Sequence, residues 1–260
     1  MTTSNDAMPQ GLAEWLEYLK LPVLQRNHED KLDEAQRNQW THREFFEAAV
    51  HDEALAKWER TARALLVAAR LPVVKTMDTW NWKLNAKEIR RDQIMPLTEL
   101  KFVSDNMNLL LIGSSGLGKT HLAIALAHTA CSRGITTRFT TAADMINHLY
   151  AALADRSLDK AMRPYLRPRL LVIDEVGYLP FSKEAGDLFF QVVSKRYERG
   201  SIILTSNRAF KNWNEIFADS IVAAAIVERL VHHSEIRIFK GKSCRLRGKE
   251  VIEAQTTGEE

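Results

Sequence analysis

The residues with the clearest chemistry form one short run of the chain. Positions 113 to 120 read GSSGLGKT, a full match to the phosphate-binding pattern G-x-x-x-x-G-K-[ST]. Glycines let successive backbone amides point inward, and the start of a following helix adds partial positive charge. The pattern therefore predicts a P-loop, a cradle for the phosphates of a nucleoside triphosphate such as ATP. We expect nucleotide contacts from the whole loop and the residue after it, namely Gly113, Ser114, Ser115, Gly116, Leu117, Gly118, Lys119, Thr120 and His121.

The last two positions of the loop carry the charge chemistry. Lys119 is expected to reach the β- and γ-phosphates, and the Thr120 hydroxyl is expected to ligate Mg²⁺. The alternative is a glycine-rich turn with an idle lysine. An apolar strand pattern precedes the loop and a helical pattern follows it, which favours the phosphate site.

A second site candidate is the run LLVIDE, which ends in Asp174 and Glu175. A buried strand that presents two carboxylates at its carboxyl end, downstream of a P-loop, matches the arrangement that holds Mg²⁺ and activates water. Asp174 is expected to bind the metal, and Glu175 to orient and deprotonate the attacking water. A glutamate beside the aspartate favours hydrolysis over simple nucleotide binding.

Further polar residues follow, each with two interpretations. Asn207, after the strand SIILTS, is either a turn-forming residue or a holder of the lytic water. Arg229 is either a surface charge or a residue that stabilises transition-state charge in a neighbouring subunit. A basic stretch near the C-terminus is either a solvated face or a phosphate-binding surface; its members are Arg237, Lys240, Lys242, Arg245, Arg247 and Lys249.

Alternating strands and helices must position these residues. Apolar runs indicate strands over 108–113, 135–140, 170–175 and 201–206. Helical patterns lie between and after them, over 121–131, 143–153, 157–167, 182–198 and 221–233. This order predicts an α/β fold in which a parallel sheet is sandwiched between helices.

The first part of the chain has a different sequence pattern, which predicts helices from about residue 12 to residue 70. Thr41 and Glu44 form a capping box at the start of a long helix that Pro72 ends. An apolar stripe on that helix packs either inside the small domain, which we favour, or against a neighbouring subunit; it comprises Leu55, Trp58, Ala62, Leu65 and Ala69. The predicted domains are a helical N-terminal domain at 1–70, a connector at 71–100, an ATPase domain at 101–250 and a disordered tail at 251–260.

Composition limits the remaining choices. The chain has 260 residues, 45% of them hydrophobic, which suffices for one sizeable core and a small extra module. Its net charge is only +3, so contacts with nucleic acid require local patches. Two distant cysteines, a polar N-terminus and the lack of an apolar run near ~18 residues predict a cytoplasmic protein with no membrane partner.

Several motifs together resemble a known family. The runs GSSGLGKTHLAIALA, LLVIDEVGYLP and SKRYERGSIILTSNRAFKNWNEIF, followed by ERLVHH, are similar to IstB, the helper ATPase of IS21-type transposons. More distantly they resemble the helicase loader DnaC, in the initiator clade of AAA+ ATPases. The resemblance covers about residues 65 to 248. It implies an AAA+ core that oligomerises with ATP between subunits, binds DNA through a central channel and recruits a partner enzyme.

The resemblance also implies roles for single residues. Asn207 matches the sensor 1 position, Arg229 the arginine finger and Arg245 the sensor 2 arginine. Cys244 replaces the aromatic residue usual before that arginine, so the choice between Arg245 and Arg247 stays open. The segment between Thr141 and Arg169 resembles the initiator-specific insertion, and its basic residues are the candidates for DNA contact: Lys160, Arg163, Arg167 and Arg169.

Three functions are consistent with these features. The first is an ATPase that assembles on DNA, mainly through backbone contacts, and activates a transposase. The second is a DnaC-like loader of a replicative helicase. The third, a nucleotide switch without catalysis, is disfavoured by Glu175.

Overall fold

The structure is a computed structural model that describes residues 8–83, 89–241 and 243. The chain divides into two compact units, Met1–Ala62 and Arg63–Glu260. Each unit is described by itself.

The first unit is helical. It contains α1 (Leu12–Tyr18), α2 (Pro22–Arg37) and most of α3 (His42–Ala69). The predicted capping box is confirmed, because the Thr41 amide donates to Glu44 Oε2 over 2.7 Å and the Glu44 amide donates to Thr41 Oγ1 over 3.2 Å. A buried Glu53 carboxylate accepts hydrogen bonds from the free amides of Val23 and Leu24, and so caps the start of α2.

The expected burial of the apolar stripe on α3 is partly wrong. Ala69, in the second unit, is fully buried, but Leu55 is 48% exposed and Trp58 is 59% exposed. The side of α3 that packs in the first unit instead carries Ala49 and Glu53. The first unit uses a polar cap and small residues where we expected large apolar side chains.

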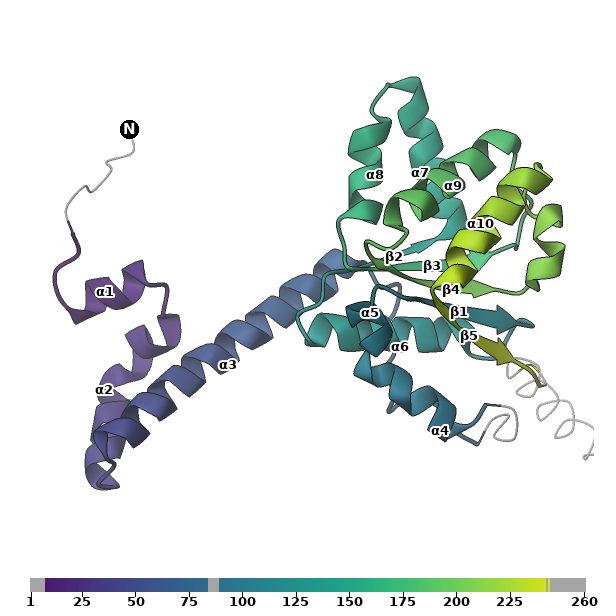
Figure 1. The fold of residues 1–260 in the computed structure, drawn as a ribbon. Helices are drawn as coiled ribbons and strands as arrows, with labels where there is room; N and C mark the ends of the chain where they lie inside the picture. Colours follow the sequence, from purple (N-terminus) through teal and green to yellow (C-terminus); the bar gives the residue numbers. More distant parts are fainter. Residues whose placement is uncertain (1–7, 84–88, 242, 244–260) are drawn as a thin grey trace, which may run out of the picture. The chain divides into compact units, whose positions relative to one another are not determined.

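The second unit is built on a five-stranded parallel sheet (Figure 1). Its strands are β1 (Asn108–Gly113), β2 (Thr137–Thr141), β3 (Leu170–Val176), β4 (Ser201–Ser206) and β5 (Ser234–Phe239). They pair in the order β2-β3-β4-β1-β5. Because all strands run in one direction, the carboxyl ends of β3, β4 and β1 lie side by side at one edge of the sheet.

Helices cover both faces of this sheet (Figure 1). One layer contains α7 (Ala142–Ala154), α8 (Leu158–Leu166), α9 (Lys183–Arg196) and α10 (Ser220–His232), with η2 (Phe210–Glu215) beside them. The other contains α4 (Arg91–Ile94), η1 (Met95–Glu99), α5 (Lys101–Ser104) and α6 (Lys119–Ser132). Alternate residues of β3 face opposite layers, with Leu171 and Ile173 on one side and Leu170 and Val172 on the other. Of the helices in the described ranges, none has the length and apolar character needed to cross a membrane.

The α/β sandwich and four of its strands are confirmed, whereas β5 was missed. We interpreted its Arg237 as part of a basic stretch outside the core. The strand pairs with β1 along its length, and Arg237 forms an ion pair with Glu235. A partly polar edge strand lacks the continuous apolar run that marks the central strands, so the pattern did not reveal it.

A buried arginine joins the basic segment around α8 to this core. Arg196, at the end of α9, is 2% exposed. Its guanidinium donates to five backbone carbonyls, at 2.8 Å to Tyr165, 3.5 Å to Leu166, 2.9 Å to Pro168, 3.0 Å to Arg169 and 2.7 Å to Ser201. Burial lowers the pKa of Arg196 to about 10, so the side chain stays charged at neutral pH. These bonds fix the turn from α8 into β3 against the start of β4.

We predict that Arg196→Met lowers the free energy of unfolding by more than about 3 kcal/mol, because buried carbonyls lose their donor. Urea denaturation measures the change. Arg199→Met is the matched control, since Arg199 is exposed and lies three residues further on; we expect a change within about 0.5 kcal/mol. Equal stability of the two variants would contradict a structural role for Arg196.

Candidate active site

The P-loop lies between β1 and α6, at the carboxyl edge of the sheet. Lys119 is buried at the first position of α6, and its Nζ donates to the carbonyl oxygens of Gly113 (2.6 Å) and Ser114 (2.8 Å). These bonds curl the loop around the ammonium group. The amino end of α6 adds its partial positive charge at the same point, which suits the binding of phosphate.

Two glycines of the loop allow close approach of other segments. Gly116 has φ +78°, and a Cβ atom there would lie 2.1 Å from the Ser243 hydroxyl oxygen. Gly118 has φ +94°, and a Cβ atom there would lie 2.9 Å from the ring of Trp80. The loop is therefore enclosed by the connector on one side and by the chain after β5 on another, and a larger residue fits at neither position.

Three side chains meet at the edge of the sheet beside the loop. The Thr120 hydroxyl donates to Asp174 Oδ1 over 2.9 Å, and the Thr205 hydroxyl donates to the same oxygen. A hydroxyl and a carboxylate are oxygen ligands of the kind that Mg²⁺ prefers. Thr120 of α6 and Asp174 of β3 therefore fit a magnesium ion, and their role as its ligands stays a prediction.

Glu175 and Asn207 lie at the same edge. Glu175 lines the cavity next to the P-loop and has φ +63°, a left-handed conformation that costs a non-glycine residue roughly 1–2 kcal/mol. Asn207, just after β4, lines the same cavity. Its Oδ1 is buried and finds no hydrogen-bond partner among the residues that the structure describes. The candidates for handling water thus converge with the phosphate cradle, although their roles stay predictions.

The cavity itself has a volume of about 490 Å³ and extends from the P-loop to the connector. Its wall beyond the phosphate cradle was not predicted. Polar residues of the connector contribute to it, and it also carries a set of apolar side chains, namely Val73, Trp80, Ile89 and Ile124. Trp80 is only 8% exposed. An apolar and aromatic slot beside a phosphate cradle suits a nucleotide base. The only signal in the sequence was the presence of large aromatic residues in a connector.

His121, expected to contact nucleotide, also ties the connector to α6. Its Nε2 lies 3.3 Å from the Thr76 carbonyl oxygen and 3.2 Å from Thr79 Oγ1, and its ring meets that of Trp80 edge-on at 5.2 Å. Burial lowers the pKa of His121, so the imidazole is neutral at pH 7. A neutral ring that bridges these groups fixes Trp80 next to the loop.

A further contact that was not predicted joins the P-loop to the segment after β3. The Tyr178 hydroxyl lies 2.9 Å from Ser115 Oγ, and both residues line the cavity. Tyr178 follows β3 by two residues and was not among the predicted site residues.

One of the predicted residues that the structure describes, Arg229, does not join this site. Arg229 lies on α10, where its guanidinium stacks over the Phe190 ring at 4.8 Å and donates to the Ala225 carbonyl. It is not among the described residues that line the cavity. Arg245, together with Arg247, lies outside the described residues.

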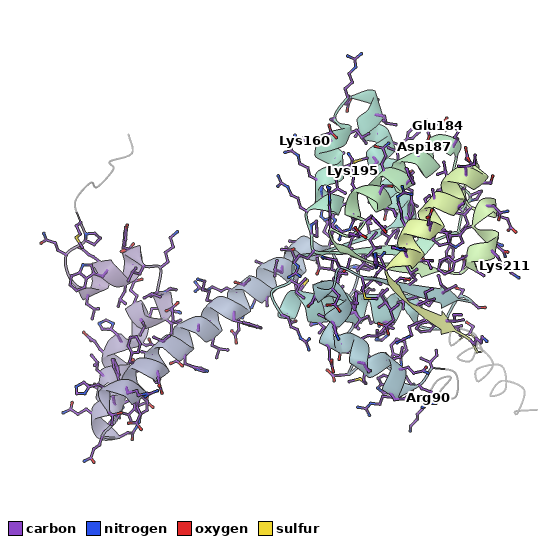
Figure 2. The ribbon with its side chains drawn as sticks, in the orientation of Figure 1. Arg90, Lys160, Glu184, Asp187, Lys195 and Lys211 are labelled. Carbon is purple, nitrogen blue, oxygen red and sulfur yellow. The ribbon has the colours of Figure 1, made fainter. Side chains whose placement is uncertain are left out.

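The candidate DNA contacts border a separate groove of about 390 Å³. Lys160, Arg163 and Arg167 line it, together with Leu65 and Ala68 from the end of α3. Lys160 is labelled on α8 in Figure 2. Arg138 of β2 was not predicted but also lines the groove, and its buried Nε has no partner within the described part of the chain. None of the described lining residues is acidic, whereas Arg169 is exposed outside the groove.

The fold and the P-loop define the class of protein. The chain superposes on the DnaC helicase loader with a TM-score of 0.53 at 24% identity, over 64% of this chain and 96% of that one. It superposes on AMPPCP-bound DnaA from Aquifex aeolicus with a TM-score of 0.52 at 22% identity, over 69% of this chain and 54% of that one. With the P-loop in place, this is an ATPase with the AAA+ fold.

Sequence comparison identifies the family. Residues 14–251 match the model of the IstB-like ATP-binding proteins, and the chain belongs to that family. It is 37% identical over 246 residues to the ATP-binding protein of insertion sequence IS5376 from Geobacillus stearothermophilus, covering 95% of this chain and 98% of the relative. It is 38% identical over 234 residues to the corresponding IS21 protein from Pseudomonas aeruginosa, covering 90% of this chain and 88% of the relative.

We predict that Trp80→Leu weakens ATP binding by at least roughly fivefold, because stacking of a base on an aromatic ring contributes about 1–3 kcal/mol. A titration with a fluorescent ATP analogue measures the dissociation constant. Trp82→Leu is the matched control, since Trp82 neighbours Trp80 but does not line the cavity. If both variants bind like the wild type, the apolar slot does not hold the base.

Proposed function

We propose that this IstB-family ATPase assembles on DNA when it binds ATP, and that the assembly activates the transposase of an insertion sequence. The observation that carries the proposal is the basic groove, whose described lining contains no acidic residue and which is separate from the nucleotide cavity. A protein that only hydrolysed ATP would not need such a groove.

In this proposal each residue at the sheet edge has one task. Lys119 holds the β- and γ-phosphates, and Thr120 with Asp174 holds the magnesium ion. The ion neutralises phosphate charge when it is bound. Glu175 takes a proton from the attacking water, and Asn207 orients that water through its Oδ1, which has no partner among the described residues.

Completion of the site requires a second subunit. Arg229 is not among the described residues that line its own cavity, and its guanidinium stacks over the ring of Phe190. An arginine held there can stabilise charge on the phosphates of a neighbour. ATP bound between subunits would then favour assembly.

The groove supplies the DNA contacts. Lys160, Arg163 and Arg167 are exposed, and Arg138 adds a half-buried charge at its wall. Like charges that lie close together repel one another, so a phosphate between them relieves an unfavourable interaction. One groove offers few contacts, and repetition of the groove in an assembly raises the affinity for one DNA molecule.

The transposase is the partner that the relatives favour. Proteins that are 37% and 38% identical over most of the chain carry insertion-sequence names. The likeness to the DnaC helicase loader is 24% identical and supports the fold alone. Therefore no specific observation favours the helicase-loader function over the transposition function.

We predict that Arg229→Ala hydrolyses ATP slowly but binds it normally, because the residue acts on the neighbour. Mixing it with Lys119→Ala should restore activity, since one variant supplies the nucleotide site and the other supplies the arginine. Steady-state ATPase rates across mixing ratios measure the recovery. The double variant Lys119→Ala/Arg229→Ala is the control and should restore nothing. Absence of recovery at every ratio would contradict a shared site.

We predict that Arg163→Glu/Arg167→Glu weakens DNA binding about equally for unrelated sequences and reduces its salt dependence. Each lost phosphate contact lowers the slope of log K against log salt by about 0.9 for duplex DNA. Anisotropy titrations at several salt concentrations, with ATP, ADP and no nucleotide, measure both effects.

Lys211→Glu is the matched control, because Lys211 is exposed on η2 and lines neither cavity (Figure 2). Loss of affinity for one sequence alone would indicate base readout. Equal affinity in the three nucleotide states would contradict ATP-driven assembly.

A further inference from the structure

The pairing of β3 with β4 contains one irregularity, and it lies at the active site. Ile173 pairs with Leu204 and Val176 pairs with Ser206, so Asp174 and Glu175 together oppose the single residue Thr205. This is the arrangement of a β-bulge, which redirects side chains and occurs often beside active sites.

The bulge explains how two successive carboxylates both lie at the nucleotide site, with Glu175 lining the cavity and Asp174 bonded to Thr120 and Thr205, which also line it. In a regular strand, neighbouring side chains point to opposite faces, so Asp174 and Glu175 would separate. Here Asp174 accepts hydrogen bonds from Thr120 and Thr205, while Glu175 turns through φ +63° and lines the cavity. A left-handed glutamate persists only where its surroundings hold it.

Thr205 is the residue that holds it. Its side chain is buried, with 2% of the residue exposed. The hydroxyl donates its one hydrogen to Asp174 Oδ1, and its oxygen accepts the Glu175 backbone N–H over 3.0 Å. One hydroxyl therefore replaces the ladder bond that the bulge removes and connects both acidic residues to β4.

We infer that Thr205 is a positioning residue for ATP hydrolysis, which fixes the bulge in β3 and so aims the Glu175 carboxylate at the water site. This inference rests on the proposed role of Glu175 as the base. Without the hydroxyl, the Glu175 amide has no described partner and the strand can relax toward regular pairing. Glu175 would then leave the cavity while the phosphate cradle stays intact.

The test compares Thr205→Val, which keeps the shape of the side chain, with Thr205→Ser, which keeps the hydroxyl. We expect Thr205→Val to lower kcat about 10²-fold, the loss typical of a misplacement near 1 Å. Its dissociation constant for a fluorescent ATP analogue should be unchanged, and Thr205→Ser should recover most of kcat. Retained kcat in Thr205→Val, lost nucleotide binding, or a Ser variant as slow as the Val variant would each overturn the inference.

A control variant at the other end of β4 tests whether loss of stability explains the result. Ser201 has a buried hydroxyl that donates to the Phe102 carbonyl, so Ser201→Ala removes a comparable bond far from the cavity. If Thr205→Val unfolds at a lower urea concentration than Ser201→Ala, kcat is compared between Thr205→Ser and Thr205→Ala instead. These two variants differ only by the hydroxyl. A kcat difference between that pair is expected, and equal kcat values would overturn the inference.

A double variant distinguishes the role inferred for Thr205 from the proposed role of Glu175 as the base. Glu175→Gln alone should lower kcat by about 10²–10⁴-fold, and normal turnover in it would contradict the role of Glu175 itself. If Thr205 acts through Glu175, then Thr205→Val/Glu175→Gln is no slower than Glu175→Gln alone. Multiplied losses would show that Thr205 acts elsewhere and would overturn the inference while leaving Glu175 as the base.

Discussion

The site depends on one shared carboxylate oxygen. Asp174 Oδ1 accepts hydrogen bonds from Thr120 of α6 and Thr205 of β4, so it joins three elements that are distant in the sequence. The sheet order makes this possible, because β4 lies between β3 and β1 and all three strands end at one edge. If one of these strands ran in the opposite direction, the P-loop and the acidic pair would lie at different edges. The fold is therefore a requirement of the chemistry.

The parts of this arrangement that the sequence predicted are those with a strong local signal. The P-loop pattern and the buried runs before Gly113 and Asp174 were sufficient to place a phosphate cradle beside two carboxylates. The bulge had no such signal, because Thr205 in SIILTS is an ordinary strand residue in any local pattern. It became visible only when β3 and β4 were paired. The position of Trp80 was not predicted for the same reason, since its place beside Gly118 is a tertiary contact.

The errors at the two ends of the chain have a different cause. On α3, the spacing of Leu55 and Trp58 indicated a helix correctly but did not show which neighbour would cover them. Periodicity identifies a face and gives no information about its partner. The acidic and basic residues of β5 masked the apolar pattern of a strand, although β5 pairs with β1. An edge strand tolerates polar side chains, and the apolar pattern that marked the central strands is therefore absent.

The relation between the basic groove and the nucleotide cavity follows from β3. The turn into this strand at Arg169 is fixed by Arg196, and the strand delivers Asp174 at its other end. At about 3.3 Å per residue, the five residues from one to the other span roughly 16 Å. This exceeds the screening length of about 10 Å at 0.1 M salt, so direct attraction between phosphate charge in the cavity and the groove is weak. The strand is fully buried up to Asp174 and clamped at its start, which leaves little room for an internal hinge. Under the proposed function, ATP therefore controls DNA binding by controlling how many grooves are brought together, and the subunit interface around Arg229 is where that control operates.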